Sequence, residues 1–302
     1  MFALAAVAGL AISACSGASG GSSAGSASAD SSGPAPILVV ASTNVWGDVV
    51  QQVGGDHVQV TSVISDPNAD PHAYQANAQN QLVLSKAALV VENGGGYDDF
   101  MQTMLASRSS GAPVINAVAA SGLTAADGEL NEHVWYDLPG TTKVADAVAE
   151  QLAALDPGDA ADYRANAAAF DRAVAALSAQ VETIKSAHGG TPVAITEPVP
   201  LYLIEAAGLV NVTPEQFSSA IENETDVPAA VMDQTRKLFT DKQVAALVYN
   251  EQTSGPQTQA LVDAAKANGI PVVPVTEILP DGQDYLTWMQ SNIQALSRAL
   301  GG

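Results

Sequence analysis

Apolar runs and segments of helical spacing alternate along most of this chain. In the first half, apolar runs that stop at polar residues predict buried strands, and the segments between them carry apolar residues at helical spacing. The strands are predicted at 37–43, 57–64, 88–96 (a strand followed by a glycine turn) and 113–117, and the helices at 45–54, 80–87 and 98–107. Strands that alternate with helices predict a parallel sheet covered on both faces.

The second half of the chain repeats this texture. Strands are predicted at 192–196, 209–213, 245–250 and 271–277. The segments between them are helical, for example 255–269, which ends at a glycine, and residues 285–300 predict a closing helix. The two halves therefore predict the same architecture used twice.

A long helix is predicted between the two halves, over residues 158–187. Apolar residues follow steps of four and three that place them on one face of a helix. They are Tyr163, Ala167, Phe170, Val174, Leu177, Val181 and Ile184. About 30 residues at 1.5 Å each give roughly 45 Å, enough to reach across two domains. The sequence predicts an α/β fold with two lobes (37–157 and 188–302), each a parallel sheet flanked by helices, joined by one long rigid helix.

The first 36 residues have a different pattern. Residues 2–12 form an apolar run of signal-peptide length that is too short to span a bilayer. The sequence ISAC at 12–15 resembles the lipobox of bacterial lipoproteins, in which the cysteine is lipidated. Residues 16–36 are rich in glycine, serine and alanine, as flexible tethers are. We therefore expect a lipoprotein signal peptide at 1–15, lipidation of Cys15 and a tether at 16–36; the alternative is a buried helix with an incidental cysteine.

Charge and cysteine content exclude several functions. The chain carries 11 basic and 32 acidic residues, a formal charge of −21, so the basic footprint of a nucleic-acid binder is missing. An acidic surface raises the local concentration of cations, although it also serves solubility alone. Cys15 is the single cysteine, which excludes a disulfide within the chain and a thiolate zinc cluster.

Candidate ligand residues follow predicted strands in both halves. His72 lies in a proline-rich loop after the second strand, at the edge where open α/β sheets bind ligands; a ligand role and a loop-building role are both open on this pattern. His133 lies in NEHVWYD (131–137), beside apolar residues that restrict water. Glu197 leaves a strand of the second half toward a proline, where it either enters the cleft between lobes or interacts with a helix dipole.

A fourth candidate is less defined. Glu251 also lies just past a strand, in YNEQTSGP (249–256), where Asn250, Gln252 or Thr253 could serve instead. The remaining histidines, His57 and His188, stand at a strand start and a helix end, as surface or capping histidines do.

These segments, in this order, identify a family resemblance. The chain resembles the solute-binding lipoproteins of zinc- and manganese-importing ABC transporters over residues 37–302. The resemblance rests on residues 41–64, on DPHAYQAN (70–77), NEHVWYD, the long helix, TEPVPLYL (196–203) and NGIPVVPVTEIL (268–279).

The resemblance implies one metal ion bound between two lobes. It implies that His72 and His133 are ligands from the first lobe and that Glu197 is a ligand from the second. That third ligand is histidine in many zinc-binding relatives and glutamate in many manganese-binding ones. The fourth is an oxygen donor in the segment matching 249–256, where this chain has Glu251.

The expected role follows from the ligand types. Two imidazoles with carboxylates suit divalent zinc or manganese, and two carboxylates neutralise a divalent ion. We expect a monomeric, non-enzymatic binding protein that is lipid-anchored at the extracytoplasmic face of the bacterial cell membrane. It would pass the ion to ABC permease and ATPase subunits, since the chain has no phosphate-binding loop of its own.

Two other functions remain open from the sequence. A metal-dependent hydrolase could use two histidines and a glutamate to activate water. Against it, the histidines are 133 − 72 = 61 residues apart and no HExxH helix is present. A surface adhesin with a structural metal is the other alternative.

Overall fold

The structure is a computed structural model that describes residues 35–67, 69, 71–108, 111–125 and 130–302. The predicted signal peptide, Cys15 and nearly all of the predicted tether lie outside the described residues. Within the described part, no helix combines the length and apolar character needed to cross a membrane.

The first lobe is built on a parallel sheet of four strands. The strands are β1 (Ile37–Thr43), β2 (Val58–Ile64), β3 (Leu89–Glu92) and β4 (Val114–Asn116), in the order β2-β1-β3-β4. The helices of this lobe are α1 (Asn44–Gly54), α2 (Ala78–Leu84), α3 (Asp99–Ala106) and α4 (Ala117–Ser121), and η1 (Gly55–His57) is a short 3₁₀ turn. All four predicted strands and all three predicted helices of the first half are confirmed.

The second lobe repeats the same strand order. Its strands are β5 (Pro192–Ile195), β6 (Val210–Asn211), β7 (Leu247–Asn250) and β8 (Val272–Val275), in the order β6-β5-β7-β8, and all pair in parallel. Its helices are α7 (Leu201–Ala206), α8 (Glu215–Glu222), α9 (Ala229–Thr240), α10 (Pro256–Ala267) and α11 (Tyr285–Ala299). The prediction of one architecture used twice is therefore confirmed.

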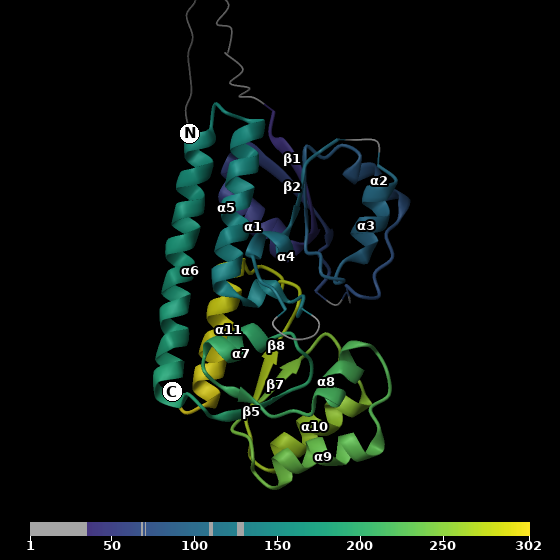
Figure 1. Ribbon diagram of the computed structural model, residues 1–302, viewed down its shortest axis with the longest axis vertical. Helices are drawn as coiled ribbons and strands as arrows, with labels where there is room; N and C mark the ends of the chain where they lie inside the picture. The colour runs from purple at the N-terminus through teal and green to yellow at the C-terminus, as the bar shows by residue number, and fades with distance from the viewer. Residues whose placement is uncertain (1–34, 68, 70, 109–110, 126–129) are drawn as a thin grey trace, which may run out of the picture. The chain divides into compact units, whose positions relative to one another are not determined.

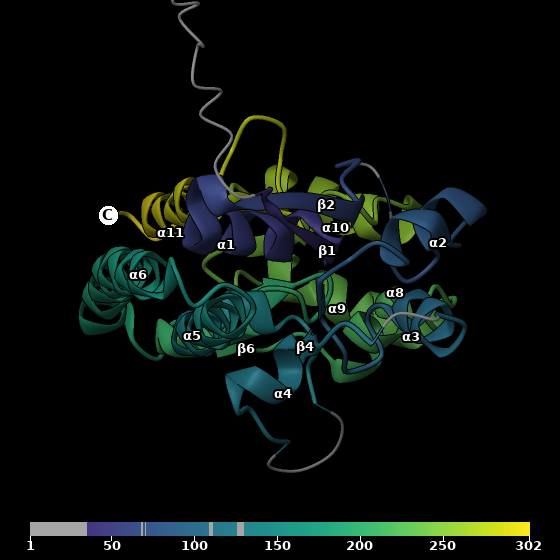
Figure 2. The ribbon, with the colours of Figure 1, turned by 90° about the horizontal axis from the view of Figure 1, so that it is seen from above.

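A long helix, α6 (Ala160–His188), joins the two lobes as predicted (Figure 1). The buried residues of α6 are the seven that helical spacing assigned to one face. The helix α5 (Leu138–Leu155), which the sequence did not predict, lies alongside α6 in both views (Figure 2). These two helices and α11 contribute to one apolar core that runs from β1 and α1 of the first lobe to β5 and β8 of the second.

The carboxyl ends of the two sheets face each other. Asn44, directly after β1, exchanges two hydrogen bonds of 3.0 Å with the backbone of Leu279, which follows β8. The Gln252 side chain, just past β7, donates to the carbonyl of Pro67 in the loop after β2. Loops that follow strands in either lobe therefore meet in one place, where a shared site can form.

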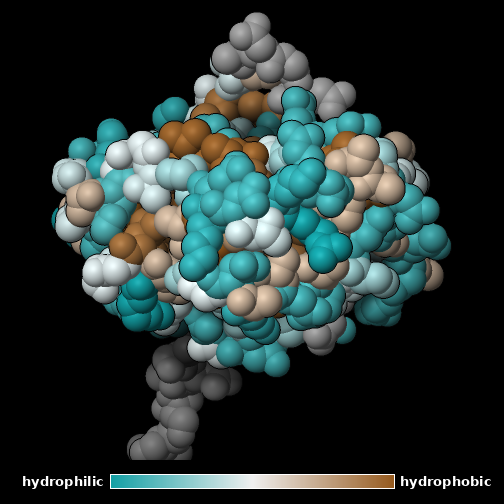
Figure 3. All heavy atoms as spheres, turned by 90° about the horizontal axis from the view of Figure 1, so that it is seen from below, coloured by the Kyte–Doolittle hydropathy of each residue, from teal (hydrophilic) through white to brown (hydrophobic). Residues whose placement is uncertain are grey.

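Polar side chains cover most of the face seen from below, interrupted by a few apolar patches (Figure 3). The large aromatic residues are instead among the most buried in the described chain, including Trp46, Trp135 and Trp288. Apolar side chains therefore pack inside the lobes and along α6. The loops between the lobes carry polar side chains that can bind a ligand.

Candidate metal centre

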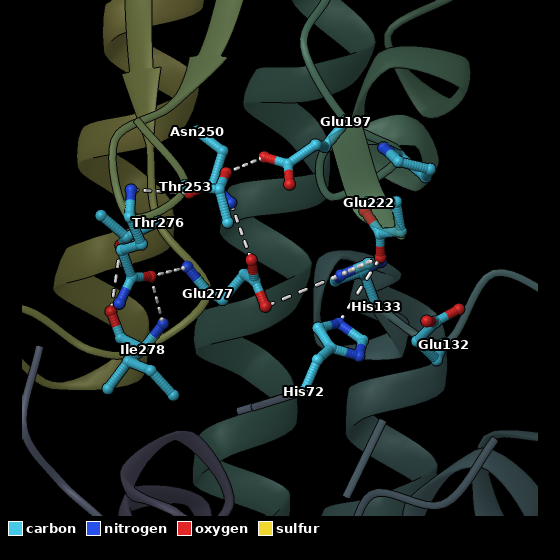
Figure 4. Close-up of polar contacts among 12 residues, drawn as sticks. His72, Glu132, His133, Glu197, Glu222, Asn250, Thr253, Thr276, Glu277 and Ile278 are labelled. Carbon is cyan, nitrogen blue, oxygen red and sulfur yellow. Dashed lines mark hydrogen bonds and ion pairs between the residues drawn. The ribbon is translucent and has the colours of Figure 1, made fainter. Parts of the chain in front are cut away.

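His72 reaches the space between the lobes from the loop after β2 (Figure 4). Its ring packs edge-on against Tyr97, with the centroids 5.1 Å apart, and its Nε2 lies 3.5 Å from Oε1 of Glu222. The side chain keeps 26% of its surface exposed, and it borders a cavity.

 The volume of that cavity is about 380 Å³, and Tyr74, Tyr97 and Phe100 are among the residues that line it.

His133 is fully buried, and its hydrogen bonds fix which ring nitrogen carries the proton. Its Nδ1 lies 2.7 Å from Oδ1 of Asn131, an amide oxygen that can only accept, so Nδ1 is the protonated nitrogen. The same oxygen accepts the backbone N–H of His133 at 3.2 Å, which supports this orientation of the amide. Nε2 therefore presents a lone pair, and it makes no hydrogen bond within the described residues.

Burial keeps the His133 ring neutral. Desolvation, with a smaller contribution from the nearby His72, lowers the pKa of His133 well below its usual value. The ring also packs against Tyr97 and Trp135, with centroids 5.8 and 5.2 Å away. A neutral imidazole with a free lone pair is the form that binds transition metals.

Asn131 also connects His133 to the second lobe. Its Nδ2 donates to the carbonyl of Pro198 at 3.0 Å, and its own carbonyl accepts the hydroxyl of Tyr202 on α7 at 2.7 Å. Two residues of the second lobe therefore hold Asn131, whose side chain orients the imidazole.

Glu277 enters the site two residues after β8. Its side chain is almost fully buried; Oε1 accepts a hydrogen bond of 2.7 Å from Asn250, and Oε2 lies 3.8 Å from Nε2 of His133. One potential ligand atom each from His72, His133 and Glu277 all lie within 4.8 Å of one another. The sequence did not single out Glu277, although its position just past a strand is the same signal that pointed to Glu197.

Glu222, the last residue of α8, also faces the imidazoles. Its Oε1 lies 3.5 Å from Nε2 of both His72 and His133. Atoms of His72, Glu132 and Glu222 form a second group within 4.8 Å. No local sequence pattern points to Glu222, because this residue lies on a helix and follows no strand.

The structure places Glu197 and Glu251 differently from the two histidines. Glu197 is buried, and its Oε2 accepts a short hydrogen bond from the hydroxyl of Thr253, toward which the side chain points (Figure 4). The side chain of Glu251 is exposed, and its backbone N–H donates to Val275. Neither residue belongs to the groups of potential ligand atoms that contain His72 and His133 among the described residues.

The other histidines lie away from this site. His57 forms an ion pair with Asp159, with Nδ1 and Oδ2 3.0 Å apart, and packs edge-on against Tyr163. This contact joins the start of β2 to the start of α6. His188 is the last residue of α6, as a helix-end histidine is expected to be.

The arrangement brings hydrogen-bond acceptors face to face. The lone pair of His133 Nε2 points at carboxylate oxygens of Glu222 and Glu277, 3.5 and 3.8 Å away. These distances are longer than hydrogen bonds. Two atoms bonded to one zinc ion at about 2.0–2.2 Å in a tetrahedron lie about 3.3–3.6 Å apart. A cation between these atoms turns a repulsive arrangement into an attractive one.

Curated proteins similar to this chain include proteins that are named for metal binding. A manganese-binding lipoprotein of Bacillus subtilis is 24% identical over 298 residues, which cover 90% of this chain and 92% of that protein. The zinc-binding protein TroA of Treponema pallidum is 24% identical over 293 residues, with the same coverage of 90% and 92%.

Solved structures share the fold. The periplasmic zinc-binding protein TroA of Treponema pallidum superimposes with a TM-score of 0.75 at 21% identity, covering 88% of this chain and 100% of that one. The protein FpvC of Pseudomonas aeruginosa, in complex with Mn²⁺, gives 0.73 at 22% identity, covering 87% and 98%. The family model described as zinc-uptake complex component A, periplasmic, matches residues 39–299. The chain therefore belongs to this family.

Proposed function

We propose that this protein is the extracytoplasmic solute-binding component of an ABC importer, which captures a divalent transition metal, zinc or manganese, and delivers it to a membrane permease. The observation that carries the proposal is the lone pair of the buried His133 Nε2, which faces two carboxylate oxygens across 3.5 and 3.8 Å. A bound cation makes that arrangement favourable. The metals named for the relatives from Bacillus subtilis and Treponema pallidum are manganese and zinc.

The proposed site has its nitrogen ligands in the first lobe and its charge in the second. His72 and His133 supply two imidazoles, and Glu277 supplies a buried carboxylate. The sequence also predicts Glu197 and Glu251 as ligands. These carboxylates would bind the ion only if the two lobes were positioned differently relative to each other. Nitrogen and oxygen ligands of this kind suit both zinc and manganese.

We further propose that the protein is held at the membrane through lipid on Cys15 and works with permease and ATPase subunits as a monomer. The printed names of the relatives include lipoproteins of manganese ABC transporters, for example that of Streptococcus gordonii. A tether at 16–36 would keep the lobes near the permease. Mass spectrometry of the protein from membranes tests the anchor, which predicts a diacylglyceryl group on the cysteine.

Metal binding itself is tested with purified protein and two histidine variants. We expect one zinc or manganese ion per chain by mass spectrometry and elemental analysis. His72→Ala should weaken binding by at least about a hundredfold, since even residues that only orient a ligand contribute about 10–100-fold. His188→Ala is the matched control and should bind like the unaltered protein. Wild-type affinity in the His72 variant would contradict the proposed site.

The runner-up, a metal-dependent hydrolase, makes a different prediction. Metal-loaded protein would then cleave model esters or phosphate esters, and the cleavage would be lost in His133→Ala. A binding role predicts no turnover above that of the free metal ion in the same buffer.

A further inference from the structure

The side chain of Gln252 connects two segments of the candidate site that lie far apart in the sequence. It is half-buried and follows β7. Its Oε1 accepts the backbone N–H of Glu277 and, at 3.0 Å, that of Ile278, and its Nε2 donates to the carbonyl of Pro67. Pro67 lies in the loop after β2 that also carries His72. One amide therefore contacts the backbone of a candidate carboxylate ligand and the loop of a candidate imidazole ligand.

These hydrogen bonds fix the orientation of the amide. An amide oxygen has two lone pairs, and the N–H groups of Glu277 and Ile278 use both of them. The amide nitrogen can only donate, and it faces a carbonyl oxygen. Turning the amide over would place a donor against two donors and an acceptor against the carbonyl of Pro67. The polar atoms of Gln252 are thus matched to backbone groups on both sides.

The backbone that accepts this support is anchored in the first lobe. Ile278 is fully buried and belongs to the apolar cluster that contains Val40 of β1. The next residue, Leu279, exchanges two hydrogen bonds of 3.0 Å with the side chain of Asn44. Three consecutive backbone N–H groups after β8 are therefore accepted by side-chain amides, which fixes the chain beside the candidate carboxylate ligand.

The segment that carries Gln252 also holds the Glu277 carboxylate. Asn250 donates to Oε1 of Glu277 at 2.7 Å, and Oε2 lies 3.8 Å from Nε2 of His133 (Figure 4). Oδ1 of Asn250 in turn accepts the backbone N–H of Gln252 at 3.2 Å. Two amides after β7 therefore hold Glu277, one by its side chain and the other by its backbone, and the second amide also reaches the loop of His72.

We propose that Gln252 is a positioning residue of the metal site, which sets the distance between the His72 loop and Glu277 and thereby slows release of the ion. This inference rests on the proposed metal-binding function. The amide does not bind the ion itself, because both lone pairs of its oxygen are already used. Ligand spacing matters because bonds to zinc are short, about 2.0–2.2 Å for nitrogen and oxygen. Residues that orient ligands contribute about 10–100-fold to metal affinity.

Gln252→Met tests this role, because methionine has a similar length and lacks the strong donor and acceptor of the amide. We expect the Kd for Zn²⁺, measured by chelator competition, to rise by about tenfold, with one ion still bound per chain. Most of the change should appear as faster dissociation in stopped-flow experiments. Gln257→Met is the matched control and should keep wild-type affinity, since the Gln257 amide also accepts from and donates to one backbone, that of Val227, within the second lobe.

The absorption of bound Co²⁺ separates positioning from a general loss of stability. Co²⁺ binds to nitrogen and oxygen ligands, and its visible bands report the coordination geometry. We expect these bands to shift in Gln252→Met and to stay unchanged in Gln257→Met. A lower melting temperature with unchanged bands and unchanged affinity would mean that Gln252 only stabilises the fold, and it would overturn the inference.

Gln252→Asn keeps an amide but shortens the side chain by one methylene, so it cannot reach both backbones and should also bind the ion about tenfold more weakly. This variant provides the test if circular dichroism shows that Gln252→Met does not fold. Wild-type affinity in either folded variant would overturn the inference and leave the proposed function intact. Failure of the unaltered protein to bind zinc or manganese would overturn the proposed function itself.

Discussion

The two lobes have the same strand order but contribute opposite kinds of chemistry to the site. The first lobe brings imidazoles, and it packs them against the aromatic rings of Tyr97 and Trp135. The second lobe brings carboxylates, and its amide and hydroxyl groups hold them, as Asn250 does for Glu277. The carboxyl ends of the two equivalent sheets therefore differ: aromatic rings surround the ligands in the first lobe, and hydrogen-bond donors surround them in the second.

This difference follows from what each ligand needs. A buried imidazole stays neutral in apolar surroundings and needs one hydrogen bond to fix its tautomer. A buried carboxylate needs donors, or its charge is too costly. An ion held only by the imidazoles would keep its full charge in a poorly solvated place. Neutralisation therefore comes from the carboxylates of the second lobe.

The largest effect on affinity is expected from the imidazole side of this comparison. His133→Leu removes a buried nitrogen ligand and fills its space with an apolar side chain. We expect metal affinity to fall by more than about a hundredfold, beyond the range of residues that only orient a ligand. Isothermal titration calorimetry with zinc measures it. A loss below tenfold would mean that the carboxylate lobe alone carries binding.

A smaller effect is expected on the carboxylate side. Glu277→Gln keeps the shape of the side chain but removes its charge, so we expect roughly a tenfold to hundredfold loss of affinity. The measurement is competition with a fluorescent chelator. Asn250→Ala, which removes the hydrogen bond to Glu277 but leaves its charge, should lose less. If Asn250→Ala lost more, the role of that hydrogen bond would exceed the role of the charge.

The hydrogen bonds of Asn131, which connect the two lobes, are expected to change metal affinity by about tenfold. Asn131→Ala leaves both imidazoles in place but frees the His133 ring to rotate and change tautomer. We expect the affinity to fall by about tenfold. Asn166→Ala is the control, because Asn166 also joins two elements through one hydrogen bond, to Val53, and lies outside the site. Equal losses in both variants would argue for a general loosening of the fold.

The linking helix should affect stability and leave affinity unchanged. Phe170 on α6 is 3% exposed and packs near Tyr285, so Phe170→Ala should reduce the free energy of unfolding by about 3–5 kcal/mol. Denaturant titration of the metal-free protein measures this change. Arg164→Ala, which breaks an exposed ion pair with Glu150, is the control and should leave unfolding nearly unchanged. If Phe170→Ala also weakened metal binding, the packing of α6 in the core would contribute to the geometry of the metal site.

The periodicity of the sequence was enough to predict the architecture. Strands stop at polar residues, and α6 buries the face that its spacing predicts, since both patterns are local. The helix α5 escaped because it begins with Leu138, Pro139 and Gly140, which are typical of a loop, although proline is well tolerated in the first turn of a helix.

The site was less predictable, because distant hydrogen bonds decide where carboxylates point. The strand-end rule drew attention to Glu197, whose carboxylate accepts a hydrogen bond from Thr253, 56 residues further along the chain, and its role as a ligand stays a prediction. Glu222 lies on a helix, and only the packing of α8 toward the first lobe brings it near the histidines. The loop after β2 supplied a usable signal for His72, and the flanking apolar residues supplied one for His133; their role as ligands stays a prediction.

The facing acceptors around His133 have a thermodynamic consequence. An ion that binds the folded chain and not the unfolded one stabilises the fold by about 4 kcal/mol when its concentration is a thousand times the dissociation constant. Metal-free protein then unfolds, and is cut by proteases, more often than loaded protein. The lifetime of the chain in the presence of a protease would therefore increase with the supply of metal.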